Sequence, residues 1–299
     1  MTAIDLSQLP APEIIEALDY ETIIAAMLTE LSQQSGQLAD GDISISEADP
    51  AYKILQVCAY RELLLRQRIN DAARSVMVAY AQDNDLEQLA ALFGIQRQVI
   101  EPGDPQAVPP VAPTYEAIER FRQRIPLSLE AFSTAGPAGA YIFHSLNASA
   151  DVKDVAVSSP APGEVLVTLL SRLGNGVPSA ELLALVNEHL NHDDIRPLTD
   201  NVSVQGATII EYQVDATLLF NRGPGQTQIT QQAQQKVNEY VSEQNKLGFD
   251  VTLSGLYAAL HQPGVQRVQL NNPTADILVS ANSASYCTNV NVVEGGIND

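Results

Sequence analysis

The stretch from residue 151 to residue 170 decides the fold of this chain. It reads Asp151-Val-Lys-Asp-Val-Ala-Val157, then a Pro160-Ala-Pro-Gly163 turn, then Glu164-Val-Leu-Val-Thr-Leu-Leu170. Apolar and polar residues alternate on both sides of the turn, which is typical of a β-hairpin. Downstream, Ser179 is a suitable N-cap for a helix over 180–190, and a strand is expected at 202–204. A hairpin, a helix and a returning strand predict a small α+β sandwich.

The C-terminal third loosely repeats this order of elements. Its pattern predicts a strand at 208–220, a glutamine-rich helix at 226–244, a second helix at 253–260 and a strand at 264–270. A further strand is suggested at 277–280. The polar tail 290–299 is expected to be mobile unless a partner orders it.

Residues 1–94 are expected to be helical, with a loop at 35–49 and a long helix from Pro50 to about Ala81. The long helix has a heptad-like pattern. One position holds Leu55, Glu62, Ile69 and Val76, and the other holds Ala51, Cys58, Leu65, Ala72 and Ala79. Such a stripe packs either against another protein or inside its own chain. The candidate interface residues on this helix are Leu55, Leu65, Ile69, Ala72 and Val76.

Five prolines between residues 101 and 113 exclude a regular helix and predict an extended connector that serves as a hinge or spacer. The predicted fold class is therefore α+β, with a helical N-terminal region followed by two small α+β domains. The expected divisions are a helical region at 1–100, a connector at 101–113, a central α+β domain at 114–205 and a C-terminal α+β domain with a polar tail at 206–299.

A basic cluster follows the connector, on a helix expected over 115–128. Arg120, Arg122 and Arg124 form the largest concentration of positive charge in the chain. One interpretation is an ion-paired contact with an acidic neighbouring protein. The other is a solvated helix face with one internal salt bridge, since exposed arginine is common.

The composition excludes several classes of function. The net charge is −20, with 36 acidic and 16 basic residues, so binding to nucleic acid or to an anionic membrane is not expected. Two cysteines, Cys58 and Cys287, form no disulfide framework. The N-terminal residues lack the pattern of a signal peptide, and no apolar run is long enough to span a membrane. We therefore expect synthesis in a cytosol.

The sequence offers little chemistry. His189 and His192 lie on one helix face, but no third metal ligand stands at a recognisable spacing. Gly174-Asn-Gly176 lies between a strand and a helix, and it lacks the remaining glycine of a dinucleotide fingerprint. No nucleophile elbow or cysteine–histidine frame is present. The sequence thus predicts no catalytic residue, no metal, no cofactor and no enzymatic activity.

The order of short motifs over 115–205 resembles the baseplate J-like family of contractile bacteriophage tails and related injection machines. Arg120 and Arg124 resemble the family's basic helix, and Ala135, Gly136, Ala140 and Tyr141 resemble its central motif. The motif residues that follow in the family's order are Val155, Val157, Gly163, Gly174, Arg196 and Pro197, and then Leu247-Gly248 and Gly264-Val265.

The resemblance implies a structural wedge protein of the virion tail baseplate, assembled in the host cytoplasm. Its members ring the central hub and transmit the trigger for sheath contraction. The implied partners are other copies of the chain, a second wedge protein, a small sheath-initiating protein and the hub. Two other functions stay open: an assembly chaperone that leaves before maturation, and a tail-associated cell-wall hydrolase.

Overall fold

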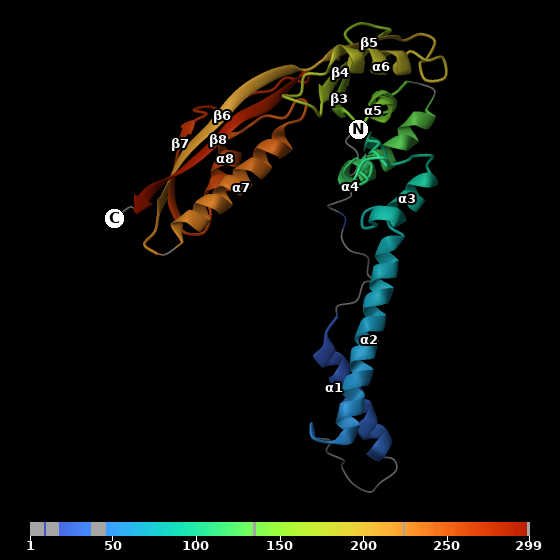
Figure 1. Ribbon diagram of the computed structural model, residues 1–299, viewed down its shortest axis with the longest axis vertical. Coiled ribbons are helices and arrows are strands. Elements are labelled where there is room, and N and C mark those ends of the chain that lie inside the picture. The colour runs from blue at the N-terminus through green and yellow to red at the C-terminus, as the bar shows by residue number, and fades with distance from the viewer. Residues whose placement is uncertain (1–8, 10–17, 37–45, 134–135, 224, 298–299) are drawn as a thin grey trace. The chain divides into compact units, whose positions relative to one another are not determined.

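The computed structural model describes residue 9 and residues 18–36, 46–133, 136–223 and 225–297 (Figure 1). The chain forms two compact units. The helical unit comprises Thr2–Gln96 and Ala117–Ile125, and the sheet unit comprises Arg97–Glu116 and Pro126–Asp299. Helices dominate the first and two three-stranded sheets the second, as the α+β prediction requires. Within the described residues, no helix is both long enough and apolar enough to cross a membrane.

In the helical unit, α1 (Tyr20–Gly36) packs against the long helix α2 (Pro50–Ser75). Asp19 caps α1, because its carboxylate accepts a hydrogen bond from the Glu21 amide at 3.1 Å. The contact between the helices is apolar and is centred on the fully buried Ala59, whose small side chain allows close approach. The residues around it are Ile23 and Ile24, with Tyr20, Met27, Leu28, Tyr52 and Leu63 at the margin.

The long helix is shorter than predicted. It ends at Ser75 instead of about Ala81, and short turns lead to α3 (Asp83–Ala91). Gly94 follows α3 with a φ of +69°, as expected for a glycine that stops a helix. The helix α4 (Ile118–Leu127) also differs from the prediction, because its residues up to Ile125 belong to the helical unit and not to the central domain.

The proline-rich stretch is not an extended connector, and this prediction was wrong. Strand β1 (Val99–Glu101) pairs antiparallel with β2 (Thr114–Tyr115), and a bridge joins Asp104 to Val111 through two hydrogen bonds of 2.9 Å. The prolines exclude a helix but leave these amides able to bond. The loop returns to its starting point, so it does not act as a spacer.

The central sheet has the order β3-β4-β5, with β3 at Val152–Ser158, β4 at Glu164–Ser171 and β5 at Asn201–Gly206. The predicted hairpin β3–β4 is confirmed, and β5 pairs parallel to β4 through the crossover helix α6 (Ala180–Leu190). Ser179 caps α6 by accepting from the Leu182 amide at 3.2 Å. Helix α5 (Ala138–Ala148), preceded by the 3-10 helix η2 (Ser128–Phe132), also packs on this sheet.

The second sheet has the order β7-β6-β8, with β6 at Thr208–Phe220 and β7 at Val265–Asn272. The helices α7 (Gln226–Gln244) and α8 (Leu253–Leu260) cover one face, where alternate β6 residues from Tyr212 to Phe220 are buried. Strand β8 (Ser283–Ile297) pairs parallel to β6, so residues 290–297 of the tail predicted to be mobile are instead in a strand, and residues 298–299 lie outside the described residues. Val290 and Val292, two residues apart on this strand, pack against the core. The polar composition of the tail hides this alternation of apolar residues.

Candidate functional site

Several motif residues of the central domain meet at one loop, 196–200, immediately before β5. Tyr141 on α5 donates a hydrogen bond from its hydroxyl to Oδ2 of Asp200 at 2.6 Å. The Thr199 hydroxyl donates to Oδ1 of the same carboxylate at 3.2 Å, and Arg196 donates to the Asp200 backbone carbonyl at 3.4 Å. Asp200 thus ties α5 to the strand that completes the sheet.

Two motif glycines lie against the same loop. Gly136 has a φ of +67°, and a Cβ atom there would lie 2.8 Å from Cγ of Pro197 and 2.9 Å from Oδ2 of Asp200. Both the backbone conformation and the lack of space therefore require glycine. The carbonyl of Gly163 accepts from the Asn201 amide at 2.7 Å, which fixes the turn of the hairpin at the start of β5. Ala135 lies outside the described residues.

Burial raises the pKa of the Tyr141 phenol far above its usual range, and the hydrogen bond to Asp200 raises it further. The phenol therefore stays protonated and remains a donor at every physiological pH. The sequence reasoning found Tyr141, Arg196 and Pro197 but missed Asp200. The one sequence feature that points to Asp200 is its place at the end of the loop that leads into β5. At such positions a carboxylate commonly accepts hydrogen bonds from backbone amides or hydroxyl groups.

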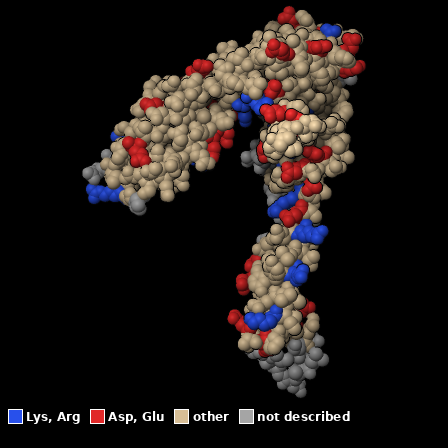
Figure 2. Space-filling model, in the orientation of Figure 1, with Lys and Arg blue, Asp and Glu red and all other residues tan. Residues whose placement is uncertain are grey.

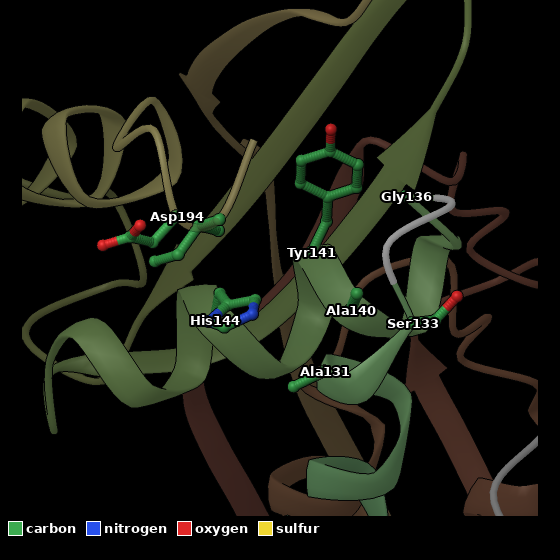
Figure 3. Close-up of a pocket in the computed structure, with 8 residues that line it drawn as sticks. Ala131, Ser133, Gly136, Ala140, Tyr141, His144 and Asp194 are labelled. Carbon is green, nitrogen blue, oxygen red and sulfur yellow. The ribbon is translucent and has the colours of Figure 1, made fainter. Parts of the chain in front are cut away.

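A hollow lies beside this cluster (Figure 3). His144 faces it from α5, and its ring centroid lies 5.9 Å from that of His189 on α6. Burial lowers the pKa of both imidazoles and so favours their neutral forms. The residues that line the hollow are Ala131, Ser133, Gly136, Ala140, Tyr141, His144, Asp194 and Ile195.

The hollow does not assemble a recognisable set of catalytic groups. The Tyr141 hydroxyl already donates its hydrogen bond to Asp200. Asp194 is the one carboxylate labelled in Figure 3, and it is not directed at His144. His189 and His192, which the sequence offers as a possible metal pair without a third ligand, have different neighbours in the structure. His189 lies against His144, while Nδ1 of His192 lies 3.5 Å from an Asp194 oxygen. Among the described residues, no group of three or more His, Cys, Asp or Glu side chains is placed to hold a metal ion.

The three candidate arginines have different surroundings. Arg124 is only 1% exposed and donates to the Gln96 carbonyl at 3.4 Å, so it is not available to a neighbouring protein. Arg122 donates to the carbonyls of Val78 and Ala81, the latter at 2.7 Å. These two residues hold α4 against the chain beyond α2, which corrects their interpretation as an intermolecular ion-pair cluster. Arg120 is partly exposed and stays a proposed contact residue.

The candidate residues on α2, and Val76 immediately after it, are mostly on the surface. Leu65, Ile69 and Val76 are 62%, 58% and 67% exposed, and Ala72 is exposed as well. Leu55 is half-buried. Glu62, the charged residue in the heptad-like pattern, pairs with Arg66 four residues later, and its Oε1 accepts a hydrogen bond from Nε of Arg66 at 2.9 Å. An apolar helix face of this extent is unusual on a surface and fits the proposed interface.

Comparison with known proteins decides the family. The chain matches the Baseplate J-like N-terminal domain at residues 47–104, the central domain at 133–206 and the C-terminal domain at 212–293. It is 44% identical to the baseplate protein J of Escherichia phage P2 over 99% of both chains. The chain belongs to the baseplate J-like family. This assignment makes it a structural component of a bacteriophage-type tail baseplate.

The match to the central domain covers the whole Tyr141–Asp200 cluster of this baseplate protein. A chain in the six-fold symmetrised baseplate of the anti-feeding prophage is also similar, with 16% identity and a TM-score of 0.42. That alignment covers 59% of this chain and 43% of the other. A resemblance of this size does not establish a shared fold.

Proposed function

We propose that this chain is a non-catalytic wedge component that surrounds the central hub of the baseplate and passes the trigger for contraction to the sheath. The observation that carries the proposal is its 44% identity, over nearly its full length, to the baseplate protein J of Escherichia phage P2. The geometry of the motif residues agrees with this role. They tie a helix, a hairpin and a returning strand into a firm block, and they do not form a reaction centre.

The proposed partners are other copies of the chain, a second wedge protein, a small sheath-initiating protein and the hub. A ring requires each subunit to present two different surfaces that meet on rotation. The exposed apolar residues Leu65 and Ile69 of α2, with Val76 immediately after the helix, supply one candidate surface. A strongly acidic surface elsewhere keeps the unassembled chain soluble and favours basic partners.

The proposal is tested by withholding the chain during assembly of the particle that encodes it. Tails should then lack a completed baseplate and an attached contractile sheath. Supply of the intact chain in trans should restore both. The wild-type chain should also remain in washed, purified particles when their proteins are identified by mass spectrometry.

The same experiment separates the two alternatives. An assembly chaperone would be required for baseplate formation but absent from the washed particles. A cell-wall hydrolase would release soluble fragments from purified peptidoglycan, whereas a structural subunit would release none. Either of these results would overturn the wedge proposal.

A further inference from the structure

Two lysine side chains of the sheet unit have no ion-pair partner among the described residues. Lys153 lies on β3, and Lys246 lies just after the end of α7. Within the part of the chain that the structure describes, neither ammonium group has a carboxylate oxygen at ion-pair distance. By contrast, Lys236 on α7 pairs with Glu239 at 2.7 Å. The absence of a partner is notable in a protein whose net charge is −20.

The turn that follows α7 brings the two lysines to one place beside β3. Nζ of Lys153 donates a hydrogen bond to Oδ1 of Asn245. The Leu247 amide donates a hydrogen bond to Oδ2 of Asp154 at 2.9 Å. Lys246 stands between Asn245 and Leu247 in the chain, so these two bonds hold it next to Lys153.

The adjacent carboxylate does not neutralise the pair. Both oxygens of Asp154 accept hydrogen bonds from backbone amides at 2.9 Å. Lys153 is half-buried, and its three N–H donors have one acceptor among the described residues, the side chain of Asn245. Burial lowers the pKa of Lys153, and the charge of Lys246 lowers it further, although Asp154 acts in the opposite direction. An anion placed between the two ammonium groups would relieve their repulsion.

An exposed aromatic ring lies beside the two charges. Phe249 is 48% exposed, and Nζ of Lys246 lies 5.5 Å from the centroid of its ring. The ring face attracts the ammonium group and keeps a large apolar area open to a further contact. Figure 2 shows a small group of Lys and Arg side chains beside the C-terminal end of α7, on a sheet unit that is otherwise mostly neutral or acidic.

We propose that Lys153, Lys246 and Phe249 form a docking surface for an acidic segment of a different baseplate protein. A carboxylate of that segment would bridge the two ammonium groups, and a neighbouring apolar side chain would pack on the ring. A chain of net charge −20 repels both its own copies and nucleic acid, so a partner that is acidic mainly in this segment fits better than either. This inference rests on the proposed function, and it adds to it the chemistry by which one partner is recognised.

Zero-length cross-linking of purified particles tests the contact. A carbodiimide joins a lysine amine to a carboxylate only where the two groups touch, and mass spectrometry identifies both residues. We expect Lys153 or Lys246 to be joined to an aspartate or glutamate of another baseplate protein. Acetylation of Lys246 by an amine-reactive ester should be about tenfold slower in particles than in the purified chain, because the contact excludes water and reagent. Lys236 is the matched control on α7, and its acetylation rate should be the same in both.

Charge substitutions test whether assembly needs the contact. The variant with Lys153→Gln and Lys246→Gln loses both charges, and we expect its yield of complete particles to fall about tenfold. The variant with Lys153→Arg and Lys246→Arg keeps both charges but has no amine at these positions, so it should assemble normally and lose the cross-link. Lys236→Gln should assemble like the wild type.

Folding of the variants is verified separately. Circular dichroism and urea unfolding of each purified chain show whether the substitution changes the fold or its stability. The single variant Lys246→Gln alters an exposed side chain only, so it keeps the test valid if the change at the half-buried Lys153 destabilises the chain. We expect this single variant also to assemble less well than Lys236→Gln.

Three results would overturn the proposed surface. Equal acetylation of Lys246 in particles and in the purified chain would show that nothing covers it. A cross-link to another copy of the chain, or protection that disappears on nuclease treatment, would identify a different occupant and reject this one. Normal assembly of both glutamine variants would show that the charges are not needed. Absence of the wild-type chain from washed particles would instead refute the proposed function itself, so the two failures are distinguishable.

Discussion

Replacing Tyr141 with phenylalanine tests the loop cluster most sharply. The substitution removes one hydroxyl and keeps the ring, so it creates no large cavity in a residue that is 2% exposed. The lost bond is a donor to a carboxylate oxygen at 2.6 Å. Hydrogen bonds to charged groups contribute about 1.5–3 kcal/mol. We therefore expect the central domain to lose about that much local stability.

The assay is native-state hydrogen exchange of the amides in α5. Because 1.4 kcal/mol corresponds to about a tenfold change in an equilibrium constant, exchange in Y141F should accelerate roughly ten- to a hundredfold. The matched control is Tyr257→Phe on α8, a 42% exposed ring whose hydroxyl has no hydrogen bond among the described residues. That variant should change exchange in its own helix by less than about twofold.

A double-mutant cycle identifies the partner. In a background with Asp200→Ala, the change Tyr141→Phe should have almost no further effect, because the acceptor has already been removed. The reasoning is refuted if Y141F accelerates exchange no more than Y257F does. It is equally refuted if the acceleration is as large without the Asp200 carboxylate as with it.

Three further predictions concern other contacts. Gly136→Ala should destabilise the central domain by about 2–3 kcal/mol, whereas Gly174→Ala should cost about 1 kcal/mol. Both glycines have a positive φ, but only at Gly136 would the added Cβ atom clash with neighbouring atoms. Equal losses of unfolding free energy for the two variants in urea would contradict this prediction. Burial lowers the pKa of His144 and His189, so the folded state binds fewer protons than the unfolded state. The free energy of unfolding should therefore be highest above about pH 6.5 and should decrease below that pH. Replacing both histidines with glutamine should flatten this pH dependence, and an unchanged slope would refute the assignment to these two residues. Arg122→Lys should lower the melting temperature of the helical unit by several degrees, because lysine does not span both carbonyls that the guanidinium binds; a wild-type melting temperature would contradict it.

Much of the sheet unit was predictable because its signals are local. Alternation and turn residues located the hairpin β3–β4, and Ser179 located the start of α6. The strand β6 and the helices α7 and α8 were placed for the same reason, since each has a clear apolar period bounded by turn residues.

The failures all depended on contacts distant in sequence. The polar composition of β8 suggested a mobile tail, but its pairing is with β6, about 75 residues earlier. The proline-rich stretch closes on itself because Asp104 and Val111 bridge, which a count of prolines does not reveal. Arg124 looked like a surface residue until its burial against the Gln96 carbonyl was seen.

The candidate site was only partly predictable for a similar reason. Gly136, Tyr141, Arg196 and Pro197 were each identified as motif residues, but their convergence on Asp200 is a property of the folded chain. A loop carboxylate before a strand is common in sequences and gives no unique signal. Its role depends on the fold, which brings Tyr141 of α5 to the loop before β5.

The most direct test of the central claim is cryo-electron microscopy of the purified particles that encode this chain. The account predicts that the chain is traced in the baseplate as repeated copies in a closed ring around the hub. Complete baseplates without density for the chain would contradict the account.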